Sequence, residues 1–151
     1  MESLATTGTK CRWNALSDWA LPKVGDQWTK HSRRALIVDD EFLIAFDLES
    51  SMRELGFDAC TVVSNERDGI ELAKSNPPDV VVMDVYLGGT RAGIEAARWL
   101  RNVCGVPVVF VTAHSDADTP ERIHAVVPAA PVLSKPVYRQ PLADAVSAVT
   151  H

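Results

Sequence analysis

Short apolar runs alternate with amphipathic stretches along most of the chain. The runs at 35–38 and 80–83 are apolar at every position, which indicates strands covered on both faces of a sheet. Between such runs the apolar residues recur at helical spacing, as in Ile44, Leu48 and Met52. The pattern therefore predicts strands and helices in alternation.

Five strands and five helices are predicted in the last 117 or so residues. The strand runs are 35–38, 58–63, 80–83, 108–111 and 132–134. The helices follow them: one ends near Gly56, one runs from Ser64 or Asn65 to about Ser75, one holds the apolar stripe of 96–104, one starts at Thr119-Pro120, and one opens at Pro141. This alternation favours right-handed parallel crossovers and a three-layer α/β/α sandwich.

The first 34 residues have a different texture, with little periodicity and a basic end. We predict that 1–34 is an arm, flexible or loosely docked, and that 35–151 is the folded domain. Trp13, Leu16 and Trp19 are spaced three residues apart, so a short amphipathic helix is the alternative interpretation of this segment.

Composition narrows the class of protein. No apolar run approaches the ~20 residues that a membrane span needs, and the start lacks a secretory signal, so a soluble cytoplasmic protein is expected. The net charge of −5 is uneven, with +3 in 1–34 and −8 in 35–151, and the acidic domain disfavours nucleic acid as a partner. Cys11, Cys60 and Cys104 are too few and too scattered for a disulfide framework or a zinc site, so idle thiols are expected.

Polar side chains stand where the predicted strands end. Asp39 and Asp40 follow the first strand, Asp84 the third, Thr112 the fourth and Lys135 the fifth. In a parallel α/β sheet these ends meet along one rim, where such folds bind ligands. The five side chains are therefore expected to converge.

Three carboxylates at one rim repel each other unless a cation neutralises them. Hard oxygen ligands without His or Cys suit Mg²⁺. An aspartate beside Mg²⁺ can act as a nucleophile toward phosphorus and become an aspartyl phosphate. Lys135 would then pair with the phosphoryl charge, and Thr112 would donate a hydrogen bond to it.

Four short motifs strengthen this interpretation: 36–41 (LIVDDE), 80–84 (VVVMD), 111–113 (VTA) and 133–136 (LSKP). In order and spacing they resemble the CheY-like receiver domains of bacterial two-component response regulators, over about residues 34–150. The resemblance implies a flavodoxin-like fold with a parallel sheet in the order 2-1-3-4-5.

The resemblance also assigns the metal site and the phosphoacceptor. Asp84 would accept the phosphoryl group and bind Mg²⁺. Asp40 would be a direct Mg²⁺ ligand, Asp39 would act through a water, and the backbone carbonyl of Tyr86 would complete the protein's share of the shell.

Further positions and partners follow from the same resemblance. Lys135 and Thr112 take the phosphate-sensing places, and Pro136 matches a position that commonly follows a cis peptide bond. A sensor histidine kinase or a histidine phosphotransfer protein would supply the phosphoryl group, which the domain would hydrolyse slowly without being an enzyme otherwise. Phosphorylation would shift the face formed by the fourth helix, the fifth strand and the fifth helix.

Some positions depart from the common pattern. Val132 stands where many receivers have an aromatic switch residue. The loop 87–93 is longer and richer in glycine than the usual Met-Pro turn, and 115–130 is short for a full fourth helix. His114, two residues after Thr112, is expected to be merely solvated.

Three alternatives stay open beside phosphorelay. A receiver fold without phosphate exchange would be a scaffold. A haloacid dehalogenase-type phosphatase would need an Asp-x-Asp pair, which adjacent Asp39 and Asp40 do not form. An FMN carrier of the same topology is disfavoured because those two charges stand where it would bind phosphate.

The end of the chain at His151 leads to a further expectation. With no DNA-binding domain after the last helix, a stand-alone, single-domain regulator is predicted, which acts by contact with a downstream protein that the sequence does not name. A homodimer through the signalling face stays open.

Overall fold

A computed structural model of the chain describes residues 32–113 and 118–150, so the predictions on the arm before residue 32 and on His114 lie outside this part. Strands and helices alternate as the apolar pattern predicts. The strands are β1 (Arg34–Val38), β2 (Ala59–Val63), β3 (Val80–Asp84), β4 (Val108–Thr112) and β5 (Val132–Ser134). The helices are α2 (Phe42–Glu54), α3 (Glu66–Ser75), α4 (Ala92–Trp99), the π-helical turn η2 (Leu100–Cys104), α5 (Thr119–Val126) and α6 (Arg139–Val149).

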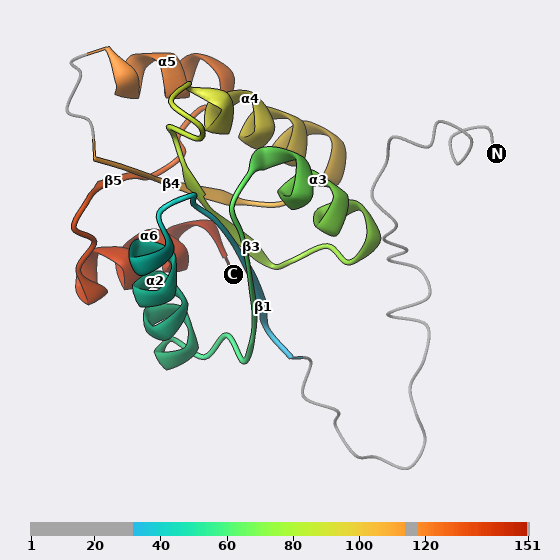
Figure 1. Cartoon of the computed structure of the whole chain (residues 1–151), viewed down its shortest axis with the longest axis vertical. Coiled ribbons are helices and arrows are strands. Elements are labelled where there is room, and N and C mark those ends of the chain that lie inside the picture. Colours follow the sequence, from blue (N-terminus) through green and yellow to red (C-terminus); the bar gives the residue numbers. More distant parts are fainter. Residues whose placement is uncertain (1–31, 114–117, 151) are drawn as a thin grey trace, which may run out of the picture.

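All five strands are parallel and lie in the order β2-β1-β3-β4-β5, which confirms the predicted three-layer sandwich and its strand order. Helices α3, α4 and α5 cover one face of the sheet, and α2 and α6 cover the other (Figure 1). Because every strand runs the same way, their carboxyl ends share one rim.

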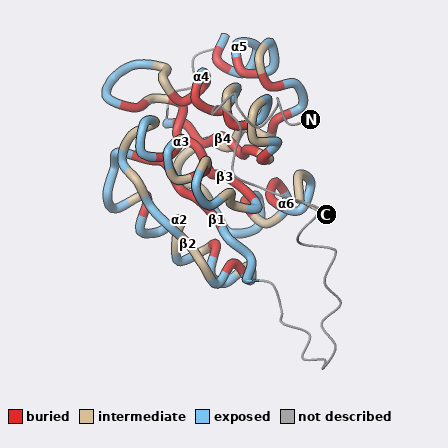
Figure 2. The backbone as a smooth tube through the Cα atoms, turned by 90° about the vertical axis from the view of Figure 1, so that its right-hand side faces the viewer, coloured by how far each residue is buried: buried red, intermediate tan, exposed pale blue. Residues whose placement is uncertain are grey.

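Two apolar cores lie on the two faces of the sheet, and the central strands contribute to both. Alternate residues of β3 point to opposite sides: Val81 and Met83 join the core under α3, α4 and α5, while Val80 and Val82 join the core under α2 and α6. In Figure 2 the central strands β3 and β4 are coloured as buried. Full coverage of both faces explains why 80–83 of β3 and 108–111 of β4 are apolar at every position.

Local signals set several helix ends. Asn65 caps α3 as predicted, because its side chain accepts a hydrogen bond from the backbone N–H of Asp68 at 2.8 Å. Helix α5 begins at Thr119 as predicted, but Asp118 and not Thr119 occupies the cap position. Helix α6 begins at Arg139, two residues before the predicted start, so Pro141 lies inside its first turn, where a missing backbone donor is tolerated.

The end of the helix after β3 differs from the sequence prediction. Helix α4 continues into η2, a π-helical turn that periodicity does not reveal, and Gly105 ends it with a left-handed φ of 69°. Leu100 at the start of η2 is fully buried. None of the helices in the described ranges is long and apolar enough to cross a membrane.

Candidate functional site

Two aspartates lie side by side at the rim of the sheet, at the ends of the adjacent strands β1 and β3. Val38 pairs with Met83 in the ladder, so the next residues, Asp39 just after β1 and Asp84 at the end of β3, lie at the same level. Both residues are buried, at 2% and 3% exposure. Buried carboxylates require partners, and the surrounding residues supply them.

Lys135 is the cationic centre of this site. Its Nζ lies 2.8 Å from Glu41 Oε1, 3.0 Å from Asp39 Oδ2 and 3.1 Å from Asp84 Oδ2, and its side chain is only 4% exposed. The backbone N–H of Lys135 donates to the carbonyl of Thr112 at 2.9 Å, which fixes the residue just past β5. The Lys135–Pro136 peptide bond is cis, as the family resemblance implies.

The pKa of Asp84 is raised to about 6. Burial is the main cause and the charge of Asp39 adds to it, while Lys135 and the N–H of Tyr86 oppose the rise. Burial also disfavours the charged form of Lys135, but its contacts with Glu41 and Asp39 and the charge of Asp84 outweigh this and raise the pKa of Lys135. Lys135 therefore stays cationic at neutral pH.

The donor atoms fit a divalent cation. Carboxylate oxygens of Asp39, Glu41 and Asp84 lie within 4.8 Å of one another. Asp39 Oδ2 is buried, and Lys135 Nζ is its ion-pair partner at 3.0 Å. A cluster of carboxylate oxygens of this kind is the environment that a hard ion such as Mg²⁺ takes.

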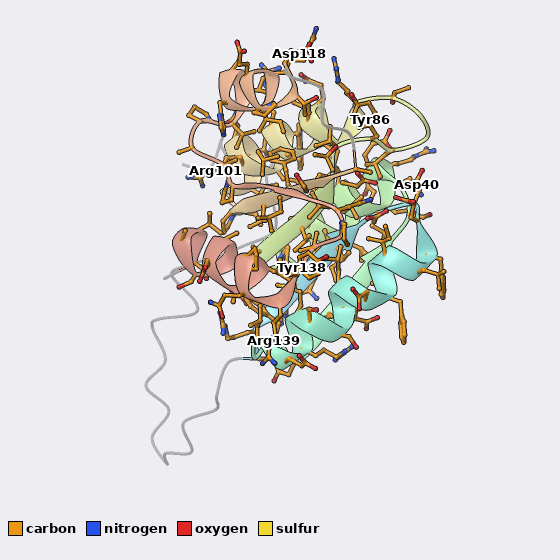
Figure 3. All side chains as sticks on the ribbon, turned by 90° about the vertical axis from the view of Figure 1, so that its left-hand side faces the viewer. Asp40, Tyr86, Arg101, Asp118, Tyr138 and Arg139 are labelled. Atoms are coloured by element: carbon orange, nitrogen blue, oxygen red, sulfur yellow. The ribbon has the colours of Figure 1, made fainter. Side chains whose placement is uncertain are left out.

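Glu41, and not Asp40, belongs to this acidic cluster. The backbone N–H of Glu41 donates to Asp39 Oδ1 at 2.9 Å and its carboxylate reaches Lys135. Asp40 is exposed, and its Oδ2 accepts a hydrogen bond from the N–H of Gly88 at 3.0 Å. Figure 3 labels Asp40 and Tyr86 at this end of the domain. Sequence reasoning gave Glu41 no role, although it is the third acidic residue of the run after β1.

The remaining predicted site residues surround the cluster. Thr112 is buried at the end of β4, next to β3 and β5. The backbone N–H of Tyr86 donates to Asp84 Oδ1 at 3.2 Å, and its hydroxyl accepts from Arg91 Nε at 2.9 Å. The structure thus brings Thr112 and Tyr86 to the rim that Asp84 occupies, as predicted.

The glycine-containing loop after β3 has a structural reason at Gly93. A Cβ built there would lie 1.9 Å from the carbonyl oxygen of Asp84, so no side chain fits. The N–H of Gly93 donates to the carbonyl of Val85 at 3.1 Å. This close approach packs the start of α4 directly behind Asp84.

Comparison with known proteins shows the family of the chain. Residues 35–147, most of the chain, match the response regulator receiver domain. The chain belongs to the response regulator receiver family. Solved structures agree: a response regulator receiver protein from Sinorhizobium medicae matches with a TM-score of 0.69 and 30% identity, over 79% of this chain and 94% of that one.

Curated relatives resemble the receiver domain over part of their length. The transcriptional regulatory protein PdtaR of Mycobacterium tuberculosis is 39% identical over 90 residues, which are 60% of this chain and 43% of the relative. The phyllosphere-induced regulator PhyR of Methylorubrum extorquens is 33% identical over 82 residues, 54% of this chain and 31% of the relative. The matched region thus covers less than half the length of each of these two relatives.

Val132 of the receiver domain is a packing residue in β5. It pairs with Phe110 in the ladder and packs against the core under α4 and α5. The side chain is half-buried and aliphatic. It cannot make the aromatic rotation that the family pattern provides at this position.

Removing the charge of Asp84 is expected to stabilise the receiver domain at neutral pH without Mg²⁺. The folded state raises the pKa of Asp84 from 3.8 to about 6, so this group favours the folded state below pH 4, and that contribution is lost as pH rises through 6. Asp84→Asn should therefore raise the free energy of unfolding by about 2–3 kcal/mol above pH 6 and by little below pH 4. Urea unfolding across this pH range in EDTA measures it; an equal gain at all pH values would contradict it.

Proposed function

We propose that this receiver domain accepts a phosphoryl group on Asp84, with Mg²⁺ bound, from a histidine kinase or a histidine phosphotransfer protein, and signals by protein contact in the bacterial cytoplasm. The observation that supports this most is the buried Asp84 carboxylate, which lies beside Lys135 and in one carboxylate cluster with Asp39 and Glu41. That arrangement offers a nucleophile, a fixed cation and a place for a second cation in one pocket.

The transfer step forms one bond to phosphorus and breaks another. An Asp84 carboxylate oxygen attacks the phosphorus of a phosphohistidine, the N–P bond breaks, and the imidazole nitrogen takes the electron pair. When bound, Mg²⁺ would offset the charge of the transferring phosphoryl group, held by Asp84, Asp39 and the nearby acidic residues. Lys135 Nζ, 3.1 Å from Asp84 Oδ2, stands ready to pair with the phosphoryl oxygens that form beside it.

The roles of the neighbouring residues follow from their places. Tyr86 holds Asp84 Oδ1 through its backbone N–H, and this hydrogen bond orients the carboxylate. Thr112 closes the opposite side of the rim at the end of β4, from which its hydroxyl would reach a phosphoryl oxygen. Slow hydrolysis of the aspartyl phosphate is the only turnover that we assign to the domain.

A donor protein has an apolar surface available beside this pocket. Phe42, Leu43 and Phe46 of α2 are 72%, 80% and 59% exposed, and Val62 of β2 lies near them. Phe42, Phe46 and Val62 share a depression of about 420 Å³ with Asp39 and other rim residues. A protein that presents a phosphohistidine to Asp84 must cover the rim, so these side chains fit its contact surface.

Phe46→Ala is expected to slow phosphorylation by a protein donor about tenfold or more. The rate of phosphorylation by acetyl phosphate should stay unchanged. The side chain contributes apolar contact area but lies outside the reacting cluster. Radiolabel transfer from a kinase that phosphorylates the wild type measures the first rate, and intact mass with acetyl phosphate the second. Tyr138→Ala, another exposed aromatic outside this surface, is the matched control; equal slowing with both donors would contradict the assignment.

Acetyl phosphate and Mg²⁺ test the proposed function directly. Intact mass should show one added phosphoryl group on the wild-type chain, and EDTA should prevent it. No adduct with any donor would favour a phosphorylation-independent scaffold. Steady turnover of a phosphorylated small molecule would favour a phosphatase instead.

A further inference from the structure

The ammonium group of Lys135 is fully occupied in this structure. An ammonium has three N–H donors, and three carboxylates surround this one, with Nζ distances of 2.8 Å to Glu41, 3.0 Å to Asp39 and 3.1 Å to Asp84. If Lys135 is to pair with a phosphoryl group formed on Asp84, a phosphoryl oxygen must take one of these places. One of the present partners therefore has to leave.

Burial separates the three carboxylates. The side chains of Asp39 and Asp84 are 0% and 4% exposed, whereas the side chain of Glu41 is 55% exposed. A buried carboxylate that loses its cation becomes an uncompensated charge in the interior, which strongly destabilises the fold. The Glu41 carboxylate can instead rotate into water, so it is the partner that leaves at the least cost.

The start of α2 offers the released carboxylate a favourable place. Glu41 holds the cap position before Phe42, but its side chain caps no backbone N–H among the described residues and pairs with Lys135 instead. The first turn of α2 contains no acidic residue. A helix N-terminus carries a partial positive charge that favours a nearby anion, so the Glu41 carboxylate has a second stabilising position close at hand.

The charge of the pocket favours the same exchange. Asp39, Glu41, Asp84 and Lys135, three carboxylates and one ammonium, give a net charge of −2, which one divalent cation balances. A phosphate group carries about −2 at neutral pH, where the Asp84 carboxylate that it replaces carries −1. Departure of Glu41 removes a charge equal to the one that phosphorylation adds.

We propose that Glu41 is a displaceable counterion of Lys135. Its carboxylate holds the ammonium in place in the unphosphorylated domain and gives up that place to a phosphoryl oxygen on Asp84. This inference rests on the proposed phosphorylation of Asp84. Glu41 is a positioning residue that acts through Lys135, and because it competes with the phosphoryl group, it lowers the affinity of the pocket for that group.

Binding of beryllium trifluoride, an anion that imitates a phosphoryl group on a carboxylate, measures this competition without turnover. Fluorine NMR of the full chain in saturating Mg²⁺ reports the bound fraction. Glu41→Gln removes the charge at unchanged side-chain length and should tighten binding about fivefold. Damage to the fold would weaken binding, so a gain in affinity is not explained by a purely structural role of Glu41.

Glu41→Asp separates the contact with Lys135 from the general effect of a nearby charge. It keeps the negative charge but withdraws the carboxylate by about 1.5 Å, the length of one C–C bond, from its 2.8 Å contact with Nζ. The affinity for beryllium trifluoride should therefore rise to a similar extent as in Glu41→Gln. An Asp variant that binds like the wild type would overturn the inference, because charge without contact would then be sufficient.

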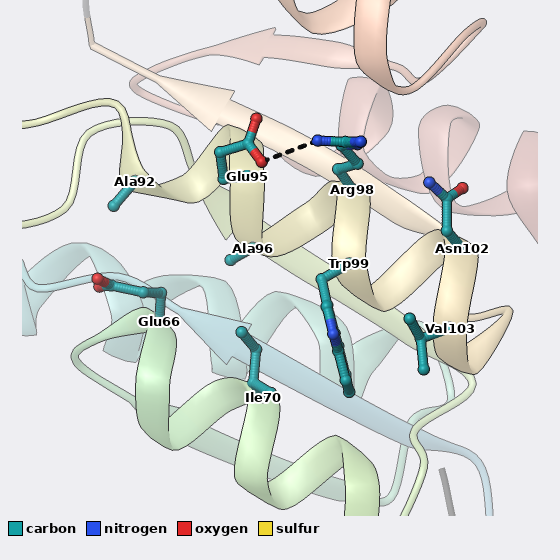
Figure 4. A pocket seen from close by; sticks show the side chains of 9 residues that line it. All are labelled: Glu66, Ile70, Ala92, Glu95, Ala96, Arg98, Trp99, Asn102 and Val103. Atoms are coloured by element: carbon teal, nitrogen blue, oxygen red, sulfur yellow. Dashed lines mark hydrogen bonds and ion pairs between the residues drawn. The ribbon is translucent and has the colours of Figure 1, made fainter. Parts of the chain in front are cut away.

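Glu95→Gln is the matched control. Glu95 also pairs with a cation, Arg98 Nη1 at 3.2 Å, but it lines a groove of about 530 Å³ between α3 and α4 with η2, beside Trp99 (Figure 4). That groove contains none of the cluster residues in its lining. This change should leave the affinity for beryllium trifluoride within about twofold of wild type.

The remaining outcomes distinguish this inference from the proposed function. Weaker binding by Glu41→Gln would show that Glu41 helps to hold Mg²⁺, and unchanged binding would show that it does not compete. Either result would overturn the displaceable counterion, while binding by the wild type would still support phosphorylation of Asp84. A wild-type chain that binds no beryllium trifluoride would overturn both.

Discussion

Asp84→Asn is expected to reduce phosphorylation by acetyl phosphate more than about 10³-fold, to below detection by intact mass. The amide lacks the anionic oxygen that attacks phosphorus. Asp84 is the cluster member that belongs to β3, the middle strand of the sheet, and its two oxygens accept from the N–H of Tyr86 and from Lys135. The pKa of about 6 further predicts that, in low Mg²⁺, the wild-type rate falls as pH drops below 6, because only the ionised carboxylate attacks.

The control for this loss is Asp47→Asn, which removes an exposed carboxylate from α2 and should leave the rate within about twofold of wild type. Misfolding would not explain the loss at Asp84, because the same substitution is expected to stabilise the domain. An adduct that persists on the Asp84→Asn chain and maps to Asp39 or Glu41 would show that the phosphoacceptor has been misassigned.

Lys135→Met is expected to destabilise the domain by about 3–5 kcal/mol in EDTA. The lysine is the one cation within ion-pair distance of Asp39, Glu41 and Asp84 among the described residues. Without it, buried carboxylates face one another without compensation, and protonation of Asp84 relieves only part of the repulsion. Urea unfolding at pH 7 measures the loss, and the loss should shrink as pH falls below 6.

Magnesium should restore part of this stability, because a divalent ion replaces the missing charge. The Mg²⁺-dependent gain should therefore be larger for Lys135→Met than for the wild type. Lys74→Met is the matched control: its Nζ lies 3.7 Å from Glu71 on the surface, and its removal should change stability by less than about 1 kcal/mol. A Lys135→Met chain as stable as wild type in EDTA would contradict the cationic-centre assignment.

Much of the fold was predictable because its signals are local. Strands covered on both faces must be apolar at each position, so 80–83 and 108–111 were evident from composition alone. The Asn65 cap and the positive φ of Gly56 likewise depend on a few neighbouring residues. The strand order came from the family resemblance, since nothing in the local pattern says which strands pair.

The aspartates of the site were predictable for a similar reason, because parallel strands place their carboxyl ends on one rim. Asp39 and Asp84 on adjacent strands, with Lys135 from β5, follow from topology once the strands are known. Topology does not determine which of Asp40 and Glu41 places its carboxylate in the cluster with Asp39 and Asp84. That choice depends on which side chain turns toward Lys135 and which toward Gly88, and these partners lie 94 and 48 residues away in the chain.

The sequence by itself determined the α/β architecture, the rim and its chemistry, because alternation of apolar runs and the residue after each strand are local properties. Only the tertiary structure decided the composition of the acidic cluster, the raised pKa of Asp84, the π-helical turn and the groove beside Trp99. Each of these arises from burial and contact between segments far apart in the chain, which no pattern within one segment records.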